Sequence, residues 1–432
     1  MEKVQAFLKQ IGFLQTWEEM APVEALFRSH MDKGLAGEDS SLPMIAAYLT
    51  ADSTGAKEQN VIVMDAGGTN LRVALMKLTP GEKPETLYSH KTLMPGKGNP
   101  ISLEEFFLVL AREVLPVAEK ADRLGFCFSF PCEIQPDLDG KILFMDKEVQ
   151  VEGCEGALVG QGLQKALKTL GVANPPRVVI LNDTVAALLG VLAEHPAECF
   201  SGYIGMILGT GFNCCYSEKS SRITKNAFLR GKEGHSIVNM EAGHFNALPI
   251  TPADELLYSR TVTGNLNAAE KQISGAYQGL LLDCLVEEAI RAGLFSQGFG
   301  ERFAQLEGET QSSQISAFVD MPAKPGRLCN LAQGGEDARV LFALCDALLE
   351  RAAMLAVMQL TAIMDASGAG RDPLKPVAIA IEGTTYEKNE RLRMKVRRML
   401  TDYTEGVRGL YSRVYSTQDA NMVGSAMAAA GV

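Results

Sequence analysis

The sequence lacks the features that would direct it to a membrane or to nucleic acid. No run of apolar residues reaches the roughly 18 that a membrane-spanning helix needs. The N-terminal stretch MEKVQAFLKQIGF has the spacing of an amphipathic helix and no apolar core of a signal peptide. The formal net charge is −11 and no basic block offsets it, so nucleic acids and anionic membranes are unfavourable partners. We therefore expect a cytoplasmic protein that acts on small molecules.

The motifs of several common enzyme families are also absent. The chain contains no GxxxxGK[ST], no GxGxxG, no HExxH and no GxSxG, which argues against P-loop NTPases, Rossmann dehydrogenases and α/β hydrolases. Its nine cysteines include no CxxC pair, and several lie in apolar runs. That pattern is typical of reduced thiols in a cytoplasmic protein.

What the sequence does contain is the composition of a folded, globular chain. Hydrophobic residues make up 47% and charged residues 22%. Because 432 residues exceed what one core normally holds, we expect two domains. Helices are predicted to dominate 1–55 and 253–366, and a helix to cover 184–194. Buried strands are predicted at 61–65, 71–78, 124–130, 178–183, 203–208, 212–217 and 377–383.

Two glycine turns each join a pair of predicted strands. The first is Asp65-Ala66-Gly67-Gly68-Thr69-Asn70, and the second is Gly209-Thr210-Gly211. Because the same strand–turn–strand plan recurs about 140 residues later, we expect two related α/β halves that face each other across a cleft.

Either turn could hold phosphate. Glycines allow positive φ and close backbone approach, so amide groups and the Thr69 hydroxyl could cradle phosphate oxygens. Asp65 suits a magnesium ion, directly or through water, and Arg72 could add a charged donor. Taken alone, the first turn is explained equally well as an ordinary hairpin, and the second is explained better that way.

Asp183 ends an apolar strand and begins a helix, a place where catalytic groups often meet a cleft. A carboxylate there could accept the proton of a hydroxyl that attacks a phosphoryl group. The alternative is a helix N-cap, for which aspartate and asparagine are favoured. Other polar residues that could bind a polyol follow strand ends or short apolar runs, and each alone could belong to a surface loop: Ser129, Lys147 and Glu241.

Together these segments resemble the hexokinase family, in particular its bacterial-type single-unit members, over nearly the whole chain. The matching stretches are SSLPMIAAYLT (40–50), DAGGTNLRVALMKL (65–78), LGFCFSFPCE (124–133), NDTVAALL (182–189), GTGFNCCY (209–216), NMEAGHF (239–245), EKQISGAYQG (270–279), AIEGTTYEKN (380–389) and GSAMAAA (424–430). Two positions depart from the family pattern. Asp146-Lys147 replaces a usual Thr-Lys, and Leu280 stands where a glutamate is usual near the anomeric end of the sugar.

The resemblance implies an α/β fold of the two-domain, actin-like ATPase (ribonuclease H-like) class with a deep interdomain cleft. It implies an N-terminal helical segment, 1–55, packed on the large domain. A small α/β domain would cover 56–181, with the helix at about 420–432 packing with it, and a large α/β domain would cover 182–419.

The resemblance also implies transfer of a phosphoryl group from ATP, with Mg²⁺, to the 6-hydroxyl of a hexose such as glucose. Asp183 would be the general base, and Lys147 would help to neutralise the charge on the moving phosphoryl group. The hexose would contact Ser129, Phe130, Asp146, Lys147, Asn182, Asp183, Asn213 and Glu241. ATP would contact Asp65, Gly67, Gly68, Thr69, Asn70, Arg72, Gly209, Thr210, Gly211, Gly383 and Thr384, with Asp65 holding the metal through water.

Three other interpretations stay open at this point. Glu241-Ala242-Gly243-His244 resembles an element of the ROK sugar kinases, whose cysteine-rich zinc loop is missing here between Cys215 and Cys284. A non-catalytic sugar sensor on a hexokinase fold would account for Leu280 and Asp146. An Hsp70-like or actin-like ATPase would hydrolyse ATP without sugar, but it would not account for the sugar segments.

Overall fold

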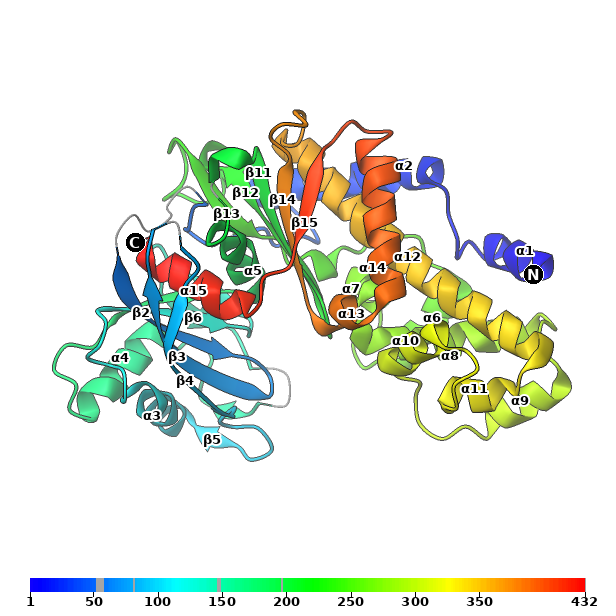
Figure 1. Ribbon diagram of the computed structural model, residues 1–432, viewed down its shortest axis with the longest axis horizontal. Helices are drawn as coiled ribbons and strands as arrows, with labels where there is room; N and C mark the ends of the chain where they lie inside the picture. The colour runs from blue at the N-terminus through cyan, green and yellow to red at the C-terminus, as the bar shows by residue number, and fades with distance from the viewer. Residues whose placement is uncertain (52–57, 81, 146–148, 196, 432) are drawn as a thin grey trace.

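Two mixed β-sheets organise the chain. The computed structural model describes residues 1–51, 58–80, 82–145, 149–195 and 197–431. In Figure 1 the first sheet lies at the lower left, the second lies near the centre, and a mostly helical region extends away from the second sheet. The N-terminus lies at the far end of that helical region, and the C-terminus lies beside the first sheet.

The first sheet has five strands in the spatial order β10-β6-β2-β3-β4. Their bounds are β2 (Gln59–Ala66), β3 (Asn70–Leu78), β4 (Glu85–Leu93), β6 (Arg123–Phe128) and β10 (Arg177–Leu181). Strands β2, β3 and β4 are antiparallel neighbours, and β6 and β10 run parallel to β2. Asp65 is in register with Cys127, and Cys127 is in register with Leu181. The ends of β2 and β10 therefore lie at the same edge of this sheet.

The second sheet repeats that plan and adds one edge strand. Its order is β1-β13-β12-β11-β14-β15. The bounds are β1 (Ile45–Ala46), β11 (Gly202–Leu208), β12 (Phe212–Lys219), β13 (His235–Asn239), β14 (Val377–Glu382) and β15 (Ser412–Tyr415). An antiparallel meander, β11-β12-β13, is again extended by two parallel strands beside its first strand. The predicted pair of related α/β halves is confirmed, and so are the strand–turn–strand predictions at both glycine turns.

Two helices connect the sheets. Helix α5 (Asp183–Leu192) packs on β11, β12 and β14, whereas α15 (Ala420–Ala430) packs on β2 and β6, and the two helices contact each other. Their apolar side chains share one hydrophobic core with both sheets. The site residues that follow β2, β10 and β11 are therefore held on one continuous core.

The remaining helices cover the outer faces of the sheets and the helical region (Figure 1). Those near the first sheet are α3 (Leu103–Val114) and α4 (Val159–Thr169). Those of the helical region are α6 (Pro252–Arg260), α7 (Ala268–Ile273), α8 (Gly275–Arg291), α9 (Gln297–Ala304), α10 (Ser312–Asp320), α11 (Arg327–Ala332), α12 (Gly335–Ser367), α13 (Thr384–Lys388) and α14 (Glu390–Met399). The described residues also form short strands and turns: β5 (Ile101–Ser102), β7 (Cys132–Ile134), β8 (Gly140–Ile142), β9 (Val151–Glu152), the 3₁₀ turns Ala197–Cys199, Ser220–Arg222 and Ala242–His244, and a π-helical turn (Leu400–Glu405). Among the described residues, no helix combines the length and hydrophobicity that a bilayer crossing requires.

The N-terminal segment is only partly helical. Helices α1 (Glu2–Gln10) and α2 (Trp17–Ala36) bury Phe7 and Phe27 in the core of the second sheet. The prediction of helix up to about residue 55 is wrong beyond α2, because β1 pairs there with β13. Met44 and Tyr48 have positive φ, at 50° and 55°, and a helix cannot continue through that conformation.

The boundaries of the two predicted domains stay predictions.

Candidate active site

Asp183 lies where β10 passes into α5. Asn182 is the N-cap, and its side-chain oxygen accepts hydrogen bonds from the Thr184 amide at 2.9 Å and the Thr184 hydroxyl at 2.6 Å. The Asp183 carboxylate also accepts from the Thr184 amide, at 2.8 Å. The N-cap of α5 is therefore Asn182, and the alternative interpretation of Asp183 as an N-cap is wrong. Asp183 is the first helical residue and is half-buried.

Asp65 is a buried carboxylate at the same edge of the first sheet. Burial raises its pKa, the positive charge of Arg72 lowers it, and the negative charge of Asp183 raises it further. Asn421 of α15 donates to one Asp65 oxygen at 3.5 Å, and the Arg72 Nε atom lies 3.6 Å from the other. The register of β2, β6 and β10 thus brings two predicted site carboxylates close enough for each to affect the other.

Glu241 brings a carboxylate from the second sheet to the same place. It follows β13 and has a φ of 55°, a left-handed conformation that is uncommon outside glycine. Burial is the largest cause that raises its pKa; Asn239 and His244 lower it, and the charges of Asp183 and Glu270 raise it. The charges of Asp183 and Glu270 thus reach a carboxyl group of the second sheet, and backbone strain of the kind seen at Glu241 is common at functional sites.

A chain of hydrogen bonds orients Glu241. The Ala242 amide donates to the Asn213 side-chain oxygen at 3.0 Å. The Asn213 side-chain nitrogen donates to the Asn239 oxygen at 2.9 Å, and the Asn239 nitrogen donates to a Glu241 oxygen at 2.7 Å. Each amide is fixed by the others, so the polar groups of β12 and β13 have defined directions, as a polyol site requires.

Glu270 of α7 is a carboxylate near these residues that was not predicted to contact the sugar or ATP. Its carboxylate accepts from the Phe212 amide at 3.2 Å, and a Cβ atom on Gly211 would lie only 3.0 Å from it. The segment that carries Glu270 was identified, but no strand end or glycine turn marks this residue. The signal that could have found it is an acidic residue about one helical turn before the conspicuous Ser274-Gly275 pair.

The first glycine turn is open to a ligand. A Cβ atom added to Gly67 would meet only the Asn70 carbonyl, at 3.9 Å. The expected use of positive φ is wrong here, since neither Gly67 nor Gly68 has it. At Gly67 the missing side chain leaves space beside the turn. The Gly67 amide donates to the Asn70 carbonyl at 3.1 Å. Thr69 is exposed at the tip of the turn, between β2 and β3.

The second glycine turn is built from three segments. The Thr385 hydroxyl and the Gly275 amide both donate to the Gly209 carbonyl, at 2.8 and 2.9 Å. Gly383 has a φ of 118°, and a Cβ atom there would lie 2.7 Å from the Gly209 amide. The turn, the start of α8 and the segment after β14 are thus in close contact. Thr210 and Thr384 are exposed on this assembly.

Comparison with known proteins decides the family. Two models that describe hexokinases match the chain, one over residues 3–192 and the other over 203–431, which is more than half of its length. This chain belongs to the hexokinase family. The family models thus favour the hexokinases over the ROK sugar kinases. The assignment to bacterial-type single-unit hexokinases stays a prediction.

Individual hexokinases agree with this assignment. Hexokinase-3 of Homo sapiens is 28% identical over 403 residues, which cover 87% of this chain and 41% of the human protein. The hexokinase of Brugia malayi is 25% identical over 440 residues, 95% of this chain and 74% of that protein. The chain therefore spans about two fifths of the human relative's length. The structure of a hexokinase from Schistosoma mansoni complexed with glucose has the same fold, with a TM-score of 0.77 at 23% identity over 99% of both chains.

Two further residues of this hexokinase-family chain, Ser129 and Phe130, are also predicted to contact the sugar, but only Ser129 lies beside a glycine turn. The Ser129 amide donates to the Ala66 carbonyl at 3.2 Å, so Ser129 lies beside the first glycine turn. Phe130 is 2% exposed and packs against Phe128 in the core of the first sheet, which suits a supporting position better than a contact. Asp146 and Lys147 lie outside the described residues.

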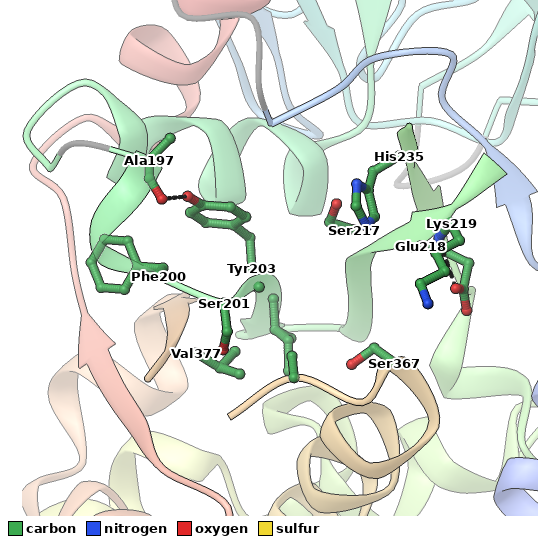
Figure 2. A pocket seen from close by; sticks show the side chains of 13 residues that line it. Ala197, Phe200, Ser201, Tyr203, Ser217, Glu218, Lys219, His235, Ser367 and Val377 are labelled. Atoms are coloured by element: carbon green, nitrogen blue, oxygen red, sulfur yellow. Dashed lines mark hydrogen bonds between the residues drawn. The ribbon is translucent and has the colours of Figure 1, made fainter. Parts of the chain in front are cut away.

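A cavity at the opposite end of the second sheet is separate from this site. Figure 2 shows it between the start of β11 and the end of β12, with Tyr203, Glu218 and His235 in its wall. Its volume is about 220 Å³, which is below the roughly 300–1,000 Å³ usual for ligand pockets. No predicted site residue lines it.

Proposed function

We propose that this chain transfers the γ-phosphoryl group of ATP to the 6-hydroxyl of a hexose, with Asp183 as the general base. The observation that carries the proposal is the position of Asp183. Its carboxylate influences both Asp65 of the first sheet and Glu241 of the second. Asp65 begins the first glycine turn, and Gly211 of the second turn lies beside Glu270, which also influences Glu241. The glucose in the related Schistosoma mansoni structure supports a hexose as substrate.

The hexose would lie against the oriented polar groups of the second sheet. Asn213 and Glu241, fixed by their hydrogen bonds with Asn239, would bind sugar hydroxyls. Glu270 would add a second acceptor, because its carboxylate lies near Glu241 and Gly211. Ser129, Asn182 and Lys147 would complete the contacts from the first sheet and its loops. Carboxylate and amide groups in fixed directions favour a polyol over an apolar ligand.

ATP would lie between the two glycine turns, with its phosphates toward Thr69 and Thr210 and its adenosine toward Gly383 and Thr384. Asp65 fits a Mg²⁺ ion held partly by water, since a buried carboxyl group with a raised pKa gains from a nearby positive charge. Among the described residues no group of three or more metal-ligating side chains occurs. The proposed ion would therefore take most of its ligands from phosphate oxygens and water. When bound, Mg²⁺ neutralises the charge that develops on the phosphates.

Asp183 would accept the proton of the 6-hydroxyl as that oxygen bonds to the γ-phosphorus and the bond to the ADP oxygen breaks. The half-buried position, with Thr184 as a hydrogen-bond donor, keeps the carboxylate directed at one place. Water competes with the sugar as the nucleophile. Movement of the two halves toward each other upon sugar binding would exclude it, and the predicted cleft between them is what would close.

The decisive experiment is an assay of ADP release over a panel of hexoses, with and without magnesium. We expect release that depends on both a hexose and Mg²⁺, with the hexose 6-phosphate as product. Sugar binding with negligible turnover would instead indicate the non-catalytic sensor. ADP release without any sugar would indicate a simple ATPase.

The general base is tested by Asp183→Ala. We expect kcat to fall by roughly 10²–10⁴-fold, the usual contribution of general-base catalysis, while the hexose dissociation constant changes far less. Turnover and calorimetric binding measure the two effects. Asp320→Ala, an exposed aspartate at the end of α10, is the matched control and should leave both unchanged. Near-normal turnover in the Asp183 variant would refute the role.

A further inference from the structure

A lysine outside every predicted contact reaches the first glycine turn. Lys97 lies in the turn that follows β4, and its ammonium group donates to the Thr69 hydroxyl at 3.0 Å. The Met94 amide donates to the Thr69 carbonyl at 3.0 Å. Residues 94–97 and Thr69 are thus joined through both backbone and side chain, although 28 positions separate Lys97 from Thr69.

The turn that carries Lys97 is held from its other side as well. The Gln150 amide donates to the Gly96 carbonyl at 2.9 Å, and Lys97 pairs with Val149 as an antiparallel bridge. Gly96 has a φ of 82°, and a Cβ atom there would lie 2.9 Å from the Gln150 carbonyl. Only glycine suits that position. The Lys97 backbone is therefore fixed between the tip of the first glycine turn and residues 149–150.

This placement has a chemical consequence. A ligand phosphate that bonds the Thr69 hydroxyl would have its oxygens within a few ångströms of the Lys97 ammonium group. Lys97 is half-buried, so water screens its charge less than it screens the charge of a surface lysine. During phosphoryl transfer negative charge is spread over the three outer oxygens of the moving group, and cations fixed beside them lower the barrier.

We propose that Lys97 is a phosphate-binding residue that contacts the terminal phosphoryl group of ATP while it is transferred. The inference rests on the proposed function and extends it. In the step, the sugar oxygen forms a bond to the γ-phosphorus, the bond from that phosphorus to the β-phosphate oxygen breaks, and the hydroxyl proton passes to Asp183. Lys97 forms and breaks no covalent bond in this step, and its ammonium group stabilises the charge on the moving group.

Lys97→Met and Lys97→Arg test this role, with Lys120→Met, an exposed lysine after α3, as the control. For Lys97→Met we expect kcat to fall at least about tenfold, and by up to the ~10²–10³-fold typical of a lost donor to a developing oxyanion. The hexose dissociation constant should change less than twofold. Lys97→Arg, which keeps the charge, should recover part of the loss. Lys120→Met should behave as the unaltered chain.

Binding of two nucleotides separates a contact with the terminal phosphate from damage to the turn. We expect Lys97→Met to weaken binding of the non-hydrolysable triphosphate AMPPNP about tenfold and to leave binding of ADP unchanged. Equal losses for both nucleotides, or no loss for either, would overturn the inference. If the unaltered chain phosphorylates no hexose, the proposed function fails, while the comparison of AMPPNP with ADP still tests Lys97.

Discussion

Glu382 illustrates how one half-buried side chain can make this molecule sensitive to pH. It ends β14, next to Gly383, and accepts from the Thr417 amide at 2.9 Å. Glu387 accepts from the Gly383 amide at 3.0 Å. Burial raises the pKa of Glu382 to about 7, the Thr417 amide lowers it, and the negative charge of Glu387 raises it again. The predicted adenosine segment is thus bordered by a carboxyl group that stays protonated in mildly acidic solution.

We predict that Glu382 makes the folded protein less stable as the pH rises. The unfolded glutamate has an ordinary pKa of 4.5 and the folded one a pKa of about 7. The folded state therefore binds more protons between these values, and its stability falls across that window and levels off above pH 7. Glu382→Gln should remove about 1–3 kcal/mol of this decline between pH 5 and pH 8.

Urea unfolding at both pH values measures this difference. Glu119→Gln, at an exposed position after α3, should decline as the unaltered chain does. Identical pH profiles for Glu382→Gln and the unaltered chain would show that Glu382 titrates normally.

At the scale of elements, the contact between α5 and α15 depends on glycine. A Cβ atom on Gly424 of α15 would lie 1.9 Å from the Ala186 carbonyl of α5, and one on Gly125 of β6 would lie 1.9 Å from the Ser425 carbonyl of α15. Helix α15 is therefore pressed against a strand on one side and a helix on the other. No side chain fits at these two contacts without movement of the backbone.

Gly424→Ala should destabilise the fold by at least about 1–3 kcal/mol, because overpacking forces backbone shifts. Gly190→Ala, on α5 at the same interface, is the matched control. Its Cβ atom would lie 3.3 Å from the nearest atom, the Ala420 carbonyl. The small shift that this contact requires opposes the helix preference of alanine, which is worth roughly 0.5–1 kcal/mol. The free energy of unfolding should therefore change little. The midpoint of thermal unfolding distinguishes the two, and equal midpoints would contradict the argument.

At the scale of the whole molecule, the proposed hexose site draws on both sheets. Asp183 follows a strand of the first sheet, whereas Asn213 and Glu241 belong to the second. A sugar that bonds all three would hold the two halves together. Ligand binding of this kind stabilises the folded state in proportion to occupancy.

We predict that glucose at a hundred times its dissociation constant raises the free energy of unfolding by about 2.7 kcal/mol, and that it lowers the radius of gyration measured by small-angle X-ray scattering. Asn213→Ala should abolish both effects at the same glucose concentration. Leu280, where the family usually has glutamate, should make the affinity weak enough to measure directly. A glucose effect confined to one half, with no change in overall dimensions, would contradict closure.

Local patterns in the sequence were enough to predict the parts of this protein that depend on neighbouring residues. Alternating and continuous apolar runs predicted the strands on both sides of each glycine turn, and the strand-to-helix junction predicted the place of Asp183. Periodicity and turn chemistry act over a few residues, so they can be read without the fold. The repeated turn also predicted two related halves, because a supersecondary unit carries its pattern with it.

Which distant groups come into contact could be known only from the folded chain. The Asn213–Asn239 bond spans 26 positions, and the contact of Glu270 with the Phe212 amide spans 58. Nothing near Lys97 in the sequence indicates Thr69, and nothing near Phe130 indicates that its ring faces the core. These outcomes follow from strand order, register and helix packing, which fix side chains in space only after many long-range contacts form together.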